Sequence, residues 1–403
     1  MSDFFQNGVI TTIHRLGRET LETLEARLQA YRNVNRVALV IPCLISELEG
    51  PAIGPIVREL AKVEYIEEIV VPIGRADRRQ FEGARRFFAP LGARGRLLWL
   101  DGAKMQSFTR ELSENGLETG PQGKGRATWF SLGYVLARGR STVIALHDAD
   151  IVTYDRWIPA RLCYPLVDPN LGYEYSKGYY SRATDRLHGR VTRLFVTPLV
   201  RALAMLAGPL PFLEYMDSFR YPLAGEFAMQ ADLARSVHIP GDWGLEIGML
   251  AEVYRNSSLR RVCQVDVADV YDHKHQILSE DDASAGLHRM ARDIAKAMLR
   301  TLAMEGVVFG DGFFTSLQVA YVRRAQEAVR SYHDDAIVNS LRFDRHSETR
   351  TVEVFTQALS TACGEFRSDP FGAMALPNWN RVTAAIPDFL RRYQEAIDSE
   401  NLS

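Results

Sequence analysis

The sequence has few cysteines and no uninterrupted apolar run long enough to cross a membrane. Its cysteines lie about a hundred residues apart, so the close CxxC spacing of structural zinc sites and redox motifs is absent. The most apolar stretch, 194–213, is interrupted by Arg201 and three prolines, whereas a bilayer span needs about 20 nearly uninterrupted apolar residues. We therefore expect reduced core cysteines (Cys43, Cys163, Cys263 and Cys363) and no transmembrane helix.

An excess of charge of one sign is also lacking. The 48 Lys and Arg residues against 50 Asp and Glu residues give a formal net charge of −2. This balance argues against general attraction to nucleic acid or to anionic lipid, so an anionic ligand must be bound by a local group of residues. The first residues show no basic region, apolar region and cleavage site in that order, and we expect a cytoplasmic protein.

Apolar runs that alternate with helical patterns predict an α/β fold. Strands that are apolar at every position suit a sheet covered on both faces, so we expect a mostly parallel, Rossmann-like sheet flanked by helices. Ligands would then bind beyond the carboxyl ends of the strands. The expected strands are 36–42, 67–73, 96–100 and 141–150, separated by helices near 52–62, 76–89 and 126–138.

The predicted organisation has three parts. Residues 1–35 form an N-terminal helical segment, 36–278 an α/β domain, and 279–403 a C-terminal helical region. The second half of the α/β domain is expected to mix strands at 171–181 and 261–273 with helices near 190–206 and 244–255.

The strongest local motif is the pair Asp148 and Asp150, which follows the apolar run 142–146 directly. Two carboxylates at the end of a buried strand can point into the cleft above a parallel sheet. There a divalent cation, held by few carboxylates and by diphosphate oxygens, would offset the charge of a leaving group. The alternative is a turn in which the aspartates cap backbone amides.

Two segments are suited to phosphate. The loop 120–125 (GPQGKG) combines glycines, Lys124 and the start of a helix, although it lacks the Ser or Thr of a Walker motif and fits a plain surface loop equally well. Between Lys177 and Arg201, six basic residues stand against one acidic residue, Asp185. Within this stretch Gly189-Arg190-Val191-Thr192 offers backbone N–H groups, a guanidinium and a hydroxyl. A solvated helix face is the alternative.

Two later segments are weaker candidates. Residues 271–275 (YDHKH) end a strand-like run, and a His and an Asp there can complete a metal site begun by the aspartate pair. Residues 241–248 (GDWGLEIG) place Glu246 at a loop-to-helix junction. A surface histidine pair and an ordinary capped turn are the alternatives.

Taken together and in order, these segments resemble the glucosyl-3-phosphoglycerate synthase family of retaining GT-A glycosyltransferases, over residues 36–290. The resemblance implies a GT-A fold with a helical C-terminal extension. It also implies transfer of glucose from an NDP-glucose, with UDP-glucose preferred, to the 2-hydroxyl of 3-phosphoglycerate, giving glucosyl-3-phosphoglycerate for glucosylglycerate synthesis. The segments that carry it are VIPCL at 40–44, GKGRATWFSLG at 123–133, DAD at 148–150, GRVTRLFVTPLVRAL at 189–203, PLAGEFAM at 222–229, GDWGLEIGML at 241–250 and His273.

The resemblance also implies residue roles. The metal, Mg²⁺ or Mn²⁺, would be held by Asp150 and His273. The catalytic residues would be Asp148, Asp150 and Glu246. The donor would contact Pro42, Leu44, Glu47, Lys124 and Asp148. The acceptor would contact Gly189, Arg190, Val191, Thr192, Gly225 and Glu226.

Three segments depart from the family's pattern. Residues 45–49 (ISELE) replace an Asn-Glu-Glu run, so we choose Glu47 as the carboxylate beside the uracil. Residues 72–77 (PIGRAD) replace an Asp-Ser-Gly-Ser type of turn, and Tyr271-Asp272 stand where the family has Arg just before the metal histidine. The alternatives are mannosyl transfer from GDP-mannose, transfer to unphosphorylated glycerate, and a noncatalytic nucleotide-sugar-binding protein.

We also expect a homodimer. The stretch Phe195–Leu213 and the C-terminal helices supply more apolar surface than the α/β core needs, and the relatives in this family are dimeric. No nucleic-acid or membrane partner is expected.

Overall fold

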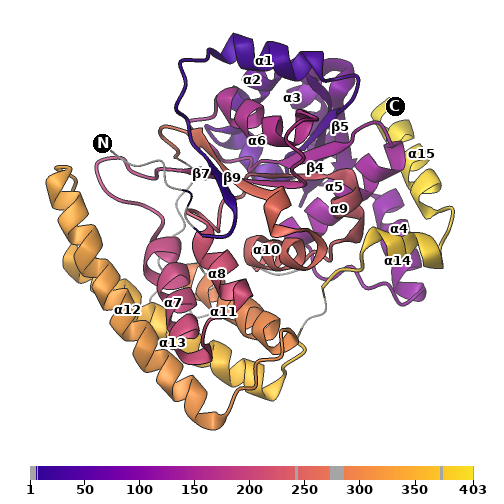
Figure 1. Ribbon diagram of the computed structural model, residues 1–403. Coiled ribbons are helices and arrows are strands. Elements are labelled where there is room, and N and C mark those ends of the chain that lie inside the picture. Colours follow the sequence, from indigo (N-terminus) through magenta and orange to yellow (C-terminus); the bar gives the residue numbers. More distant parts are fainter. Residues whose placement is uncertain (1–5, 7, 241–243, 273–285, 373–374, 403) are drawn as a thin grey trace.

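The chain forms a nine-stranded sheet between two layers of helices (Figure 1). The computed structural model describes residues 6, 8–240, 244–272, 286–372 and 375–402. Within them the strand order is β1-β9-β7-β8-β6-β2-β4-β3, and β5 also pairs with β4. Every pairing is parallel except those of β8, which runs antiparallel to β6 and β7. The predicted α/β class with a mostly parallel sheet is confirmed.

The predicted strands are present, most of them with shorter bounds because backbone pairing stops before the apolar pattern does, whereas β4 extends beyond the predicted 67–73. Strand β8 was not predicted. An additional two-residue strand, β3, extends one edge of β4. The strands after β1 are β2 (Val37–Val40), β3 (Cys43–Leu44), β4 (Ile66–Gly74), β5 (Gly95–Trp99), β6 (Val143–Leu146), β7 (Tyr175–Tyr180), β8 (Phe227–Gln230) and β9 (Val262–Ala268).

The N-terminal segment is not purely helical, contrary to the prediction for residues 1–35. Thr11–Ile13 form strand β1, which pairs in parallel with Cys263–Val265 of β9. A three-residue strand carries too little periodicity to be recognised in a sequence. The expected helix follows as α1 (Leu21–Ala30), whose Leu24 and Leu28 are buried where it packs against α6 (Trp157–Val167).

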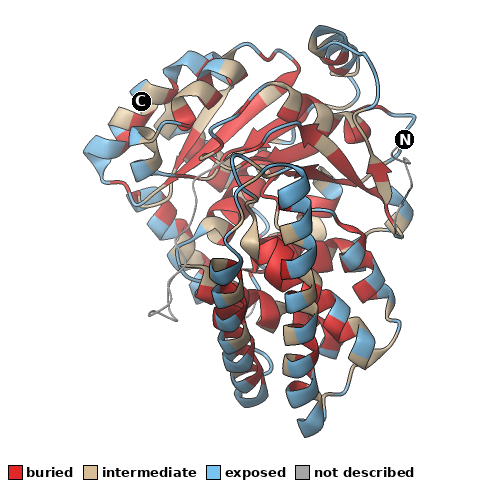
Figure 2. Cartoon of the chain, turned by 90° about the vertical axis from the view of Figure 1, so that its left-hand side faces the viewer, coloured by how far each residue is buried: buried red, intermediate tan, exposed pale blue. Residues whose placement is uncertain are grey.

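Alternate residues of the strands feed two separate apolar cores. Val37 and Leu39 of β2 face the core shared with α1, α2, α3 and α6, whereas Ala38 and Val40 face the core shared with α4, α5, α9 and α10. Figure 2 shows the sheet buried between these layers. Besides α1 and α6, the helices of the α/β domain include α2 (Ile53–Ala61), α3 (Arg78–Phe88), α4 (Ala103–Glu114), α5 (Lys124–Arg138), α8 (Pro211–Ser218), α9 (Ala231–Ser236) and α10 (Leu245–Asn256). Short 3₁₀ turns are η1 (Ile45–Glu49), η2 (Ala89–Arg94) and η4 (Leu259–Arg261).

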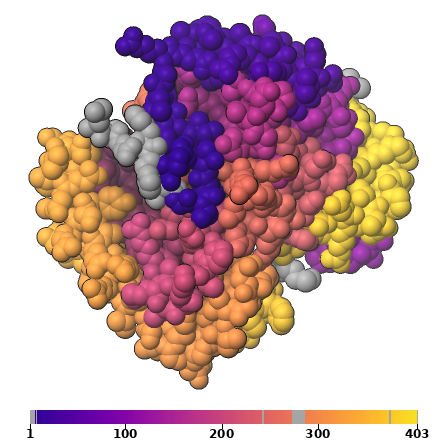
Figure 3. Space-filling view, viewed as in Figure 1, coloured from indigo at the N-terminus to yellow at the C-terminus, as the bar shows by residue number. Residues whose placement is uncertain are grey.

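The predicted C-terminal helical region divides into two parts that cover different sides of the molecule (Figures 1 and 3). Helices α11 (Gly286–Met304), α12 (Asp311–Val338) and α13 (Arg345–Ser368) pack together and against the π-helical turn η3 (Val191–Val196). Helices α14 (Trp379–Ala385) and α15 (Phe389–Leu402) return to the α/β domain, where α15 packs on α5 and β5. Trp379 stacks on Trp129 of α5 with 4.2 Å between ring centroids.

The apolar stretch Phe195–Leu213 is covered by the same chain. Its helix α7 (Thr197–Ala207) packs along α12, and the ring of Phe195 contacts those of Tyr321 and Phe355. This stretch therefore leaves little spare apolar surface, contrary to the argument made for a homodimer. The homodimer itself stays a prediction.

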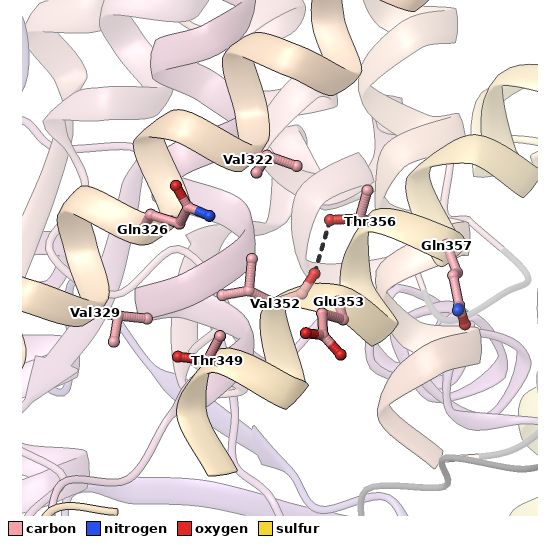
Figure 4. A pocket seen from close by; sticks show the side chains of 8 residues that line it. All are labelled: Val322, Gln326, Val329, Thr349, Val352, Glu353, Thr356 and Gln357. Carbon is pink, nitrogen blue, oxygen red and sulfur yellow. Dashed lines mark hydrogen bonds between the residues drawn. The ribbon is translucent and has the colours of Figure 1, made fainter. Parts of the chain in front are cut away.

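A groove of about 350 Å³ lies between α12 and α13, far from the predicted site residues in the sequence (Figure 4). Valines from both helices line it, together with polar side chains, and its one carboxylate is Glu353. The lining residues are Val322, Gln326, Val329, Thr349, Val352, Glu353, Thr356 and Gln357.

The cysteines and the membrane-spanning potential of the helices can both be compared with the predictions. All four cysteines are buried and unpaired, as expected of reduced core residues. Of the helices in the described ranges, none is long and apolar enough to cross a bilayer.

Candidate active site

Several of the predicted site residues lie at one edge of the sheet. Strands β2 and β6 are parallel neighbours, so the segments after Val40 and Leu146 leave the sheet side by side. Strand β8 runs the other way, with Phe227 opposite Leu146, so the residues just before β8 lie at the same edge. The topology therefore gathers the donor loop, the aspartate pair and Gly225-Glu226 in one place.

Lys124, the first residue of α5, joins two predicted catalytic carboxylates. Its Nζ donates to Oδ1 of Asp148 at 2.6 Å and to Oε1 of Glu246 at 2.9 Å. Burial alone would lower the pKa of Lys124, but Asp148 and Glu246 outweigh it and the pKa is raised. The ammonium thus stays charged, and three residues from separate motifs form one cluster, which we call the Lys124 cluster.

Gly225 packs directly against the carboxylate of Asp148. A Cβ atom at this position would lie 2.2 Å from Oδ2 of Asp148, so the Asp148 carboxylate would have to move to admit one. The preceding residue fixes the loop, because the Ala224 N–H donates to the carbonyl of Tyr221 and its carbonyl accepts from Lys177 Nζ at 2.7 Å. Burial lowers the pKa of Lys177 to about 8, and this amine holds the loop instead of facing a ligand.

Glu226 is fully buried and both of its carboxylate oxygens accept tyrosine hydroxyls. Tyr180 donates to Oε2 at 2.8 Å and Tyr271 to Oε1 at 2.6 Å, and the two rings stack with centroids 3.6 Å apart. Burial and the nearby Asp148 raise the pKa of Glu226. Tyr271 stands where the family has arginine, so in this chain the position supports Glu226.

Asp150 lies among carboxylates. Burial and the neighbouring Asp148 raise the pKa of Asp150 to about 7, Lys124 partly opposes them, and Glu47 and Glu226 raise it further. Such a surplus of hard oxygen donors suits a divalent cation, and Mg²⁺ is commonly held by one or two carboxylates together with substrate phosphates. The residues present therefore fit the predicted metal.

The second predicted ligand is not placed by the structure, because His273 lies outside the described residues. Within the described ranges, no group of three His, Cys, Asp or Glu side chains is close enough to hold an ion without help from a substrate. The metal roles of Asp150 and His273 stay predictions.

The predicted donor loop follows β2 at the same edge. Leu44 is exposed and Pro42 half-buried. The effect of Glu47 on the pKa of Asp150 shows that this carboxylate lies near the aspartate pair. The donor-binding roles of Pro42, Leu44 and Glu47 stay predictions.

The neighbouring loops are tied together beside this edge. Asp101 accepts the backbone N–H of Ala76 through Oδ2 at 3.0 Å and the side-chain amide of Gln122 through Oδ1 at 2.9 Å. The loop after β4 is thereby connected to the glycine-rich loop that precedes Lys124. Sequence inspection identified both loops but not this connection.

The predicted acceptor segment, Gly189–Thr192, leads into η3. Gly189 has a φ of +71°, a left-handed conformation that favours glycine, and Tyr221 lies against it. Because Tyr221 also accepts the Ala224 N–H, it links this segment to the loop of Gly225. A π-helical turn such as η3 is frequent at functional sites.

The side chains of this segment are held within the protein. Arg190 donates from Nε to Oε1 of Glu348 at 2.8 Å and from NH2 to Oγ of Ser347 at 3.1 Å. Val191 is buried, and the buried Thr192 hydroxyl has no hydrogen-bond partner among the described residues. The phosphate-binding role of the segment stays a prediction.

Several residues of the site were not found from the sequence. For Lys177 the sequence indicated only its place in the basic stretch 177–201, not its contact with the Ala224 carbonyl. The pairing of Tyr180 with Tyr271 requires the register of β7 and β9, and the contact of Arg190 with Glu348 spans 158 residues. Neither contact can be predicted from a single sequence.

Comparisons with known proteins give close relatives along the whole chain. No family model matches it. It is 45% identical over 401 residues to the glucosyl-3-phosphoglycerate synthase of Persephonella marina, covering 100% of this chain and 99% of the relative. It is 36% identical over 399 residues to the enzyme of the same name from Methanococcoides burtonii, covering 98% and 97%.

Solved structures show the shared fold. The glucosyl-3-phosphoglycerate synthase of Mycobacterium tuberculosis in complex with Mg²⁺ and UDP has a TM-score of 0.54 at 24% identity, covering 73% of this chain and 87% of that one. The mannosyl-3-phosphoglycerate synthase of Rubrobacter xylanophilus has a TM-score of 0.55 at 23% identity, covering 74% and 83%. The predicted glycosyltransferase fold is confirmed. With such identity over the full length of two relatives, the chain belongs to the glucosyl-3-phosphoglycerate synthase family of glycosyltransferases.

Proposed function

We propose that the protein transfers glucose from UDP-glucose to the 2-hydroxyl of 3-phosphoglycerate, with retention of the anomeric configuration. The observation that carries this proposal is the 45% identity along the entire chain to a glucosyl-3-phosphoglycerate synthase. The Lys124 cluster supports it, because it places a charged lysine beside the aspartate pair at the edge of the sheet where ligands bind in such folds.

On the donor side, Lys124 would face the diphosphate, and Pro42, Leu44 and Glu47 would surround the base. The mycobacterial neighbour has been solved with Mn²⁺, UDP-glucose and phosphoglyceric acid. Asp150 and His273 would hold Mg²⁺ or Mn²⁺ in this chain. When bound, such an ion neutralises charge on the departing diphosphate.

The carboxylates proposed to lie near the sugar already accept hydrogen bonds from protein side chains. This favours a mechanism in which the acceptor hydroxyl attacks the sugar from the same face that the diphosphate leaves. Glu226 is occupied by Tyr180 and Tyr271, and Glu246 accepts from Lys124. Neither is arranged as a free nucleophile, so we propose that an oxygen of the leaving phosphate accepts the proton of the acceptor hydroxyl. Lys124 would stabilise the negative charge that develops there.

On the acceptor side, the phosphate of 3-phosphoglycerate would be bound by Arg190, by the hydroxyl of Thr192 and by the backbone N–H groups of Gly189–Thr192. The Thr192 hydroxyl supports this, since it is buried without a partner among the described residues. Gly225-Glu226 would contact the sugar and the reacting hydroxyl from the opposite side.

A matrix of donors and acceptors tests the proposal. Purified protein is incubated with UDP-glucose or GDP-mannose, and with 3-phosphoglycerate or glycerate, with Mg²⁺ or with a chelator. We expect nucleoside diphosphate release with UDP-glucose, 3-phosphoglycerate and Mg²⁺, and a large loss of activity on chelation. Preference for GDP-mannose or for glycerate would establish one of the alternative reactions. Binding of donor without turnover in any combination would indicate a noncatalytic protein.

We also propose that the protein is a cytoplasmic homodimer. Exposed apolar side chains on α12, among them Val319 and Val338, and the groove between α12 and α13 support a contact between copies. Sedimentation equilibrium at micromolar concentration should give twice the 45.4 kDa of one chain. A mass near 45.4 kDa would refute the dimer.

A further inference from the structure

Glu348, in the first turn of α13, joins Arg190 of the predicted acceptor segment to Arg193, the residue that directly follows this segment. Its Oε1 accepts from Nε of Arg190 at 2.8 Å and its Oε2 from NH1 of Arg193 at 3.0 Å. The Glu348 carboxylate is almost completely buried, with 6% of the side chain exposed. One carboxylate between two guanidiniums leaves a net positive charge, so the group can still attract an anion.

Arg190 is held along one edge only. Its Nε and NH2 groups contact Glu348 and Ser347, whereas NH1 makes no hydrogen bond to another described residue. A guanidinium has five donors in a rigid fork, so two contacts fix its plane and leave donors for a ligand. This arrangement fixes the orientation of the Arg190 side chain and leaves its remaining N–H donors available to a ligand.

Arg193 holds the turn before Gly189. Its Nε donates to the carbonyl of His188 at 2.7 Å and its NH2 to that of Leu187 at 3.4 Å. The guanidinium also lies over the ring of Tyr332 of α12, 4.9 Å from its centroid. Through Arg193, Glu348 therefore sets the position of the backbone that enters the acceptor segment.

An independent contact fixes the other end of the same loop. The backbone N–H of Arg342, in the connection between α12 and α13, donates to the carbonyl of Asp185 at 2.8 Å, and the side chains of the two residues pair at 3.3 Å. The loop from Asp185 to Arg193 is thus bound to the α12–α13 connection at both ends.

We propose that Glu348, assisted by Ser347, is a positioning residue for acceptor phosphate, and that the start of α13 is a structural part of the acceptor site. The inference rests on the proposed function, in which Arg190 binds that phosphate. A binding residue keeps its productive geometry only when neighbouring groups hold its side chain, and in metal sites the loss of such a supporting group typically costs about 10- to 100-fold in affinity.

The test compares Glu348→Gln with Glu395→Gln, a matched change at an exposed carboxylate of α15, where Glu395 pairs with Arg391. Steady-state rates are measured at varied 3-phosphoglycerate and at varied UDP-glucose, and again with glycerate. We expect Glu348→Gln to raise the KM for 3-phosphoglycerate about tenfold, to change the KM for UDP-glucose less than about twofold, and to weaken the preference for 3-phosphoglycerate over glycerate. Glu395→Gln should match the wild type.

Ser347→Ala is a second variant, because it removes one contact to Arg190 without unpairing a buried charge. We expect it to raise the same KM about two- to fivefold with an unchanged melting temperature. An unchanged KM for 3-phosphoglycerate in both folded variants would overturn the proposal. An equal rise for both substrates and for glycerate would do so as well, since it would indicate a general structural effect.

Calorimetric titration of 3-phosphoglycerate separates this inference from the proposed function. If the wild type binds 3-phosphoglycerate but transfers no glucose, the proposed function fails, and weaker binding by Glu348→Gln would still support the positioning role. If the wild type turns over and Glu348→Gln has wild-type kinetics, only the positioning role fails. If the wild type binds no 3-phosphoglycerate, both fail.

Discussion

The Nζ atom of Lys124 lies 2.6 Å from Oδ1 of Asp148, so the lysine at the start of α5 is bound to the aspartate pair at the end of β6. The same ammonium reaches Glu246 of α10. One cation thereby fixes three elements of the site relative to one another. An incoming diphosphate would compete with, or share, this cation, which couples donor binding to the placement of Asp148 and Glu246.

Replacing Lys124 should strongly reduce the efficiency with which the protein uses the sugar donor. Lys124→Met removes the charge and leaves two carboxylates without their counter-ion, so we expect kcat/KM for UDP-glucose to fall by about a hundredfold or more. Lys62→Met, at an exposed lysine that pairs with Glu59 of α2, is the control and should retain activity. Wild-type kinetics in Lys124→Met would contradict the donor role.

A methyl group at Gly225 should displace Asp148. Gly225→Ala places its Cβ against the carboxylate, and we expect kcat to fall more than about tenfold while the protein remains folded. Gly83→Ala is the matched control, since a Cβ there meets nothing within 4 Å on α3. It should be fully active and more stable by up to about 1 kcal/mol. If Gly225→Ala were as active as Gly83→Ala, the close contact would have no bearing on catalysis.

The two tyrosines on Glu226 should contribute to stability. Tyr271→Phe leaves one oxygen of a fully buried carboxylate without its donor, and urea unfolding should show a loss of about 1–3 kcal/mol. Tyr31→Phe serves as the comparison, because the Tyr31 hydroxyl makes no hydrogen bond to another described residue. Equal stability of the two variants would show that the Tyr271 hydroxyl is not needed.

His147 should make the protein less stable as the pH falls. Burial lowers the pKa of this histidine to about 3, and its Nδ1 lies 3.0 Å from the hydroxyl of Tyr154. Below the ordinary pKa of about 6.5 the unfolded chain takes up a proton that the folded chain does not, so each pH unit from there down to about 3 costs about 1.4 kcal/mol.

The measurement compares the free energy of unfolding at pH 7 and pH 5. His147→Asn, which cannot titrate, should lose about 2 kcal/mol less than the wild type over this interval. The variant is expected to be less stable at pH 7, and the difference should narrow at pH 5. A constant difference would mean that His147 is not held neutral.

Much of the fold could be predicted because its signals are local. The strands β2 and β6 are apolar at every position and β4 and β5 over most of their length, since helices cover both faces of the sheet. Strand β1 could not be predicted, because three residues carry no pattern and their partner Cys263 lies far along the chain. The antiparallel β8 was missed for the same reason, as only its neighbours define it.

The sequence could indicate candidate residues of the site but not the contacts between them. The order and spacing of the motifs, through the family resemblance, singled out Lys124, Asp148 and Glu246 as candidates. In the structure Lys124 lies within hydrogen-bonding distance of both carboxylates. The resemblance assigned Arg190 to the acceptor but carried no information on α13. Its contact with Glu348 depends on how the C-terminal helices pack, which a single sequence does not state.

The most direct test of the account is the identity of the product formed from UDP-glucose labelled with ¹³C at the anomeric carbon. The protein is incubated with this donor, 3-phosphoglycerate and Mg²⁺, and the product is followed by NMR. The account predicts equimolar UDP and a new α-anomeric signal coupled to the C2 position of 3-phosphoglycerate. Free glucose as the sole product, a β-anomeric signal, or no consumption of UDP-glucose while GDP-mannose is consumed would contradict it.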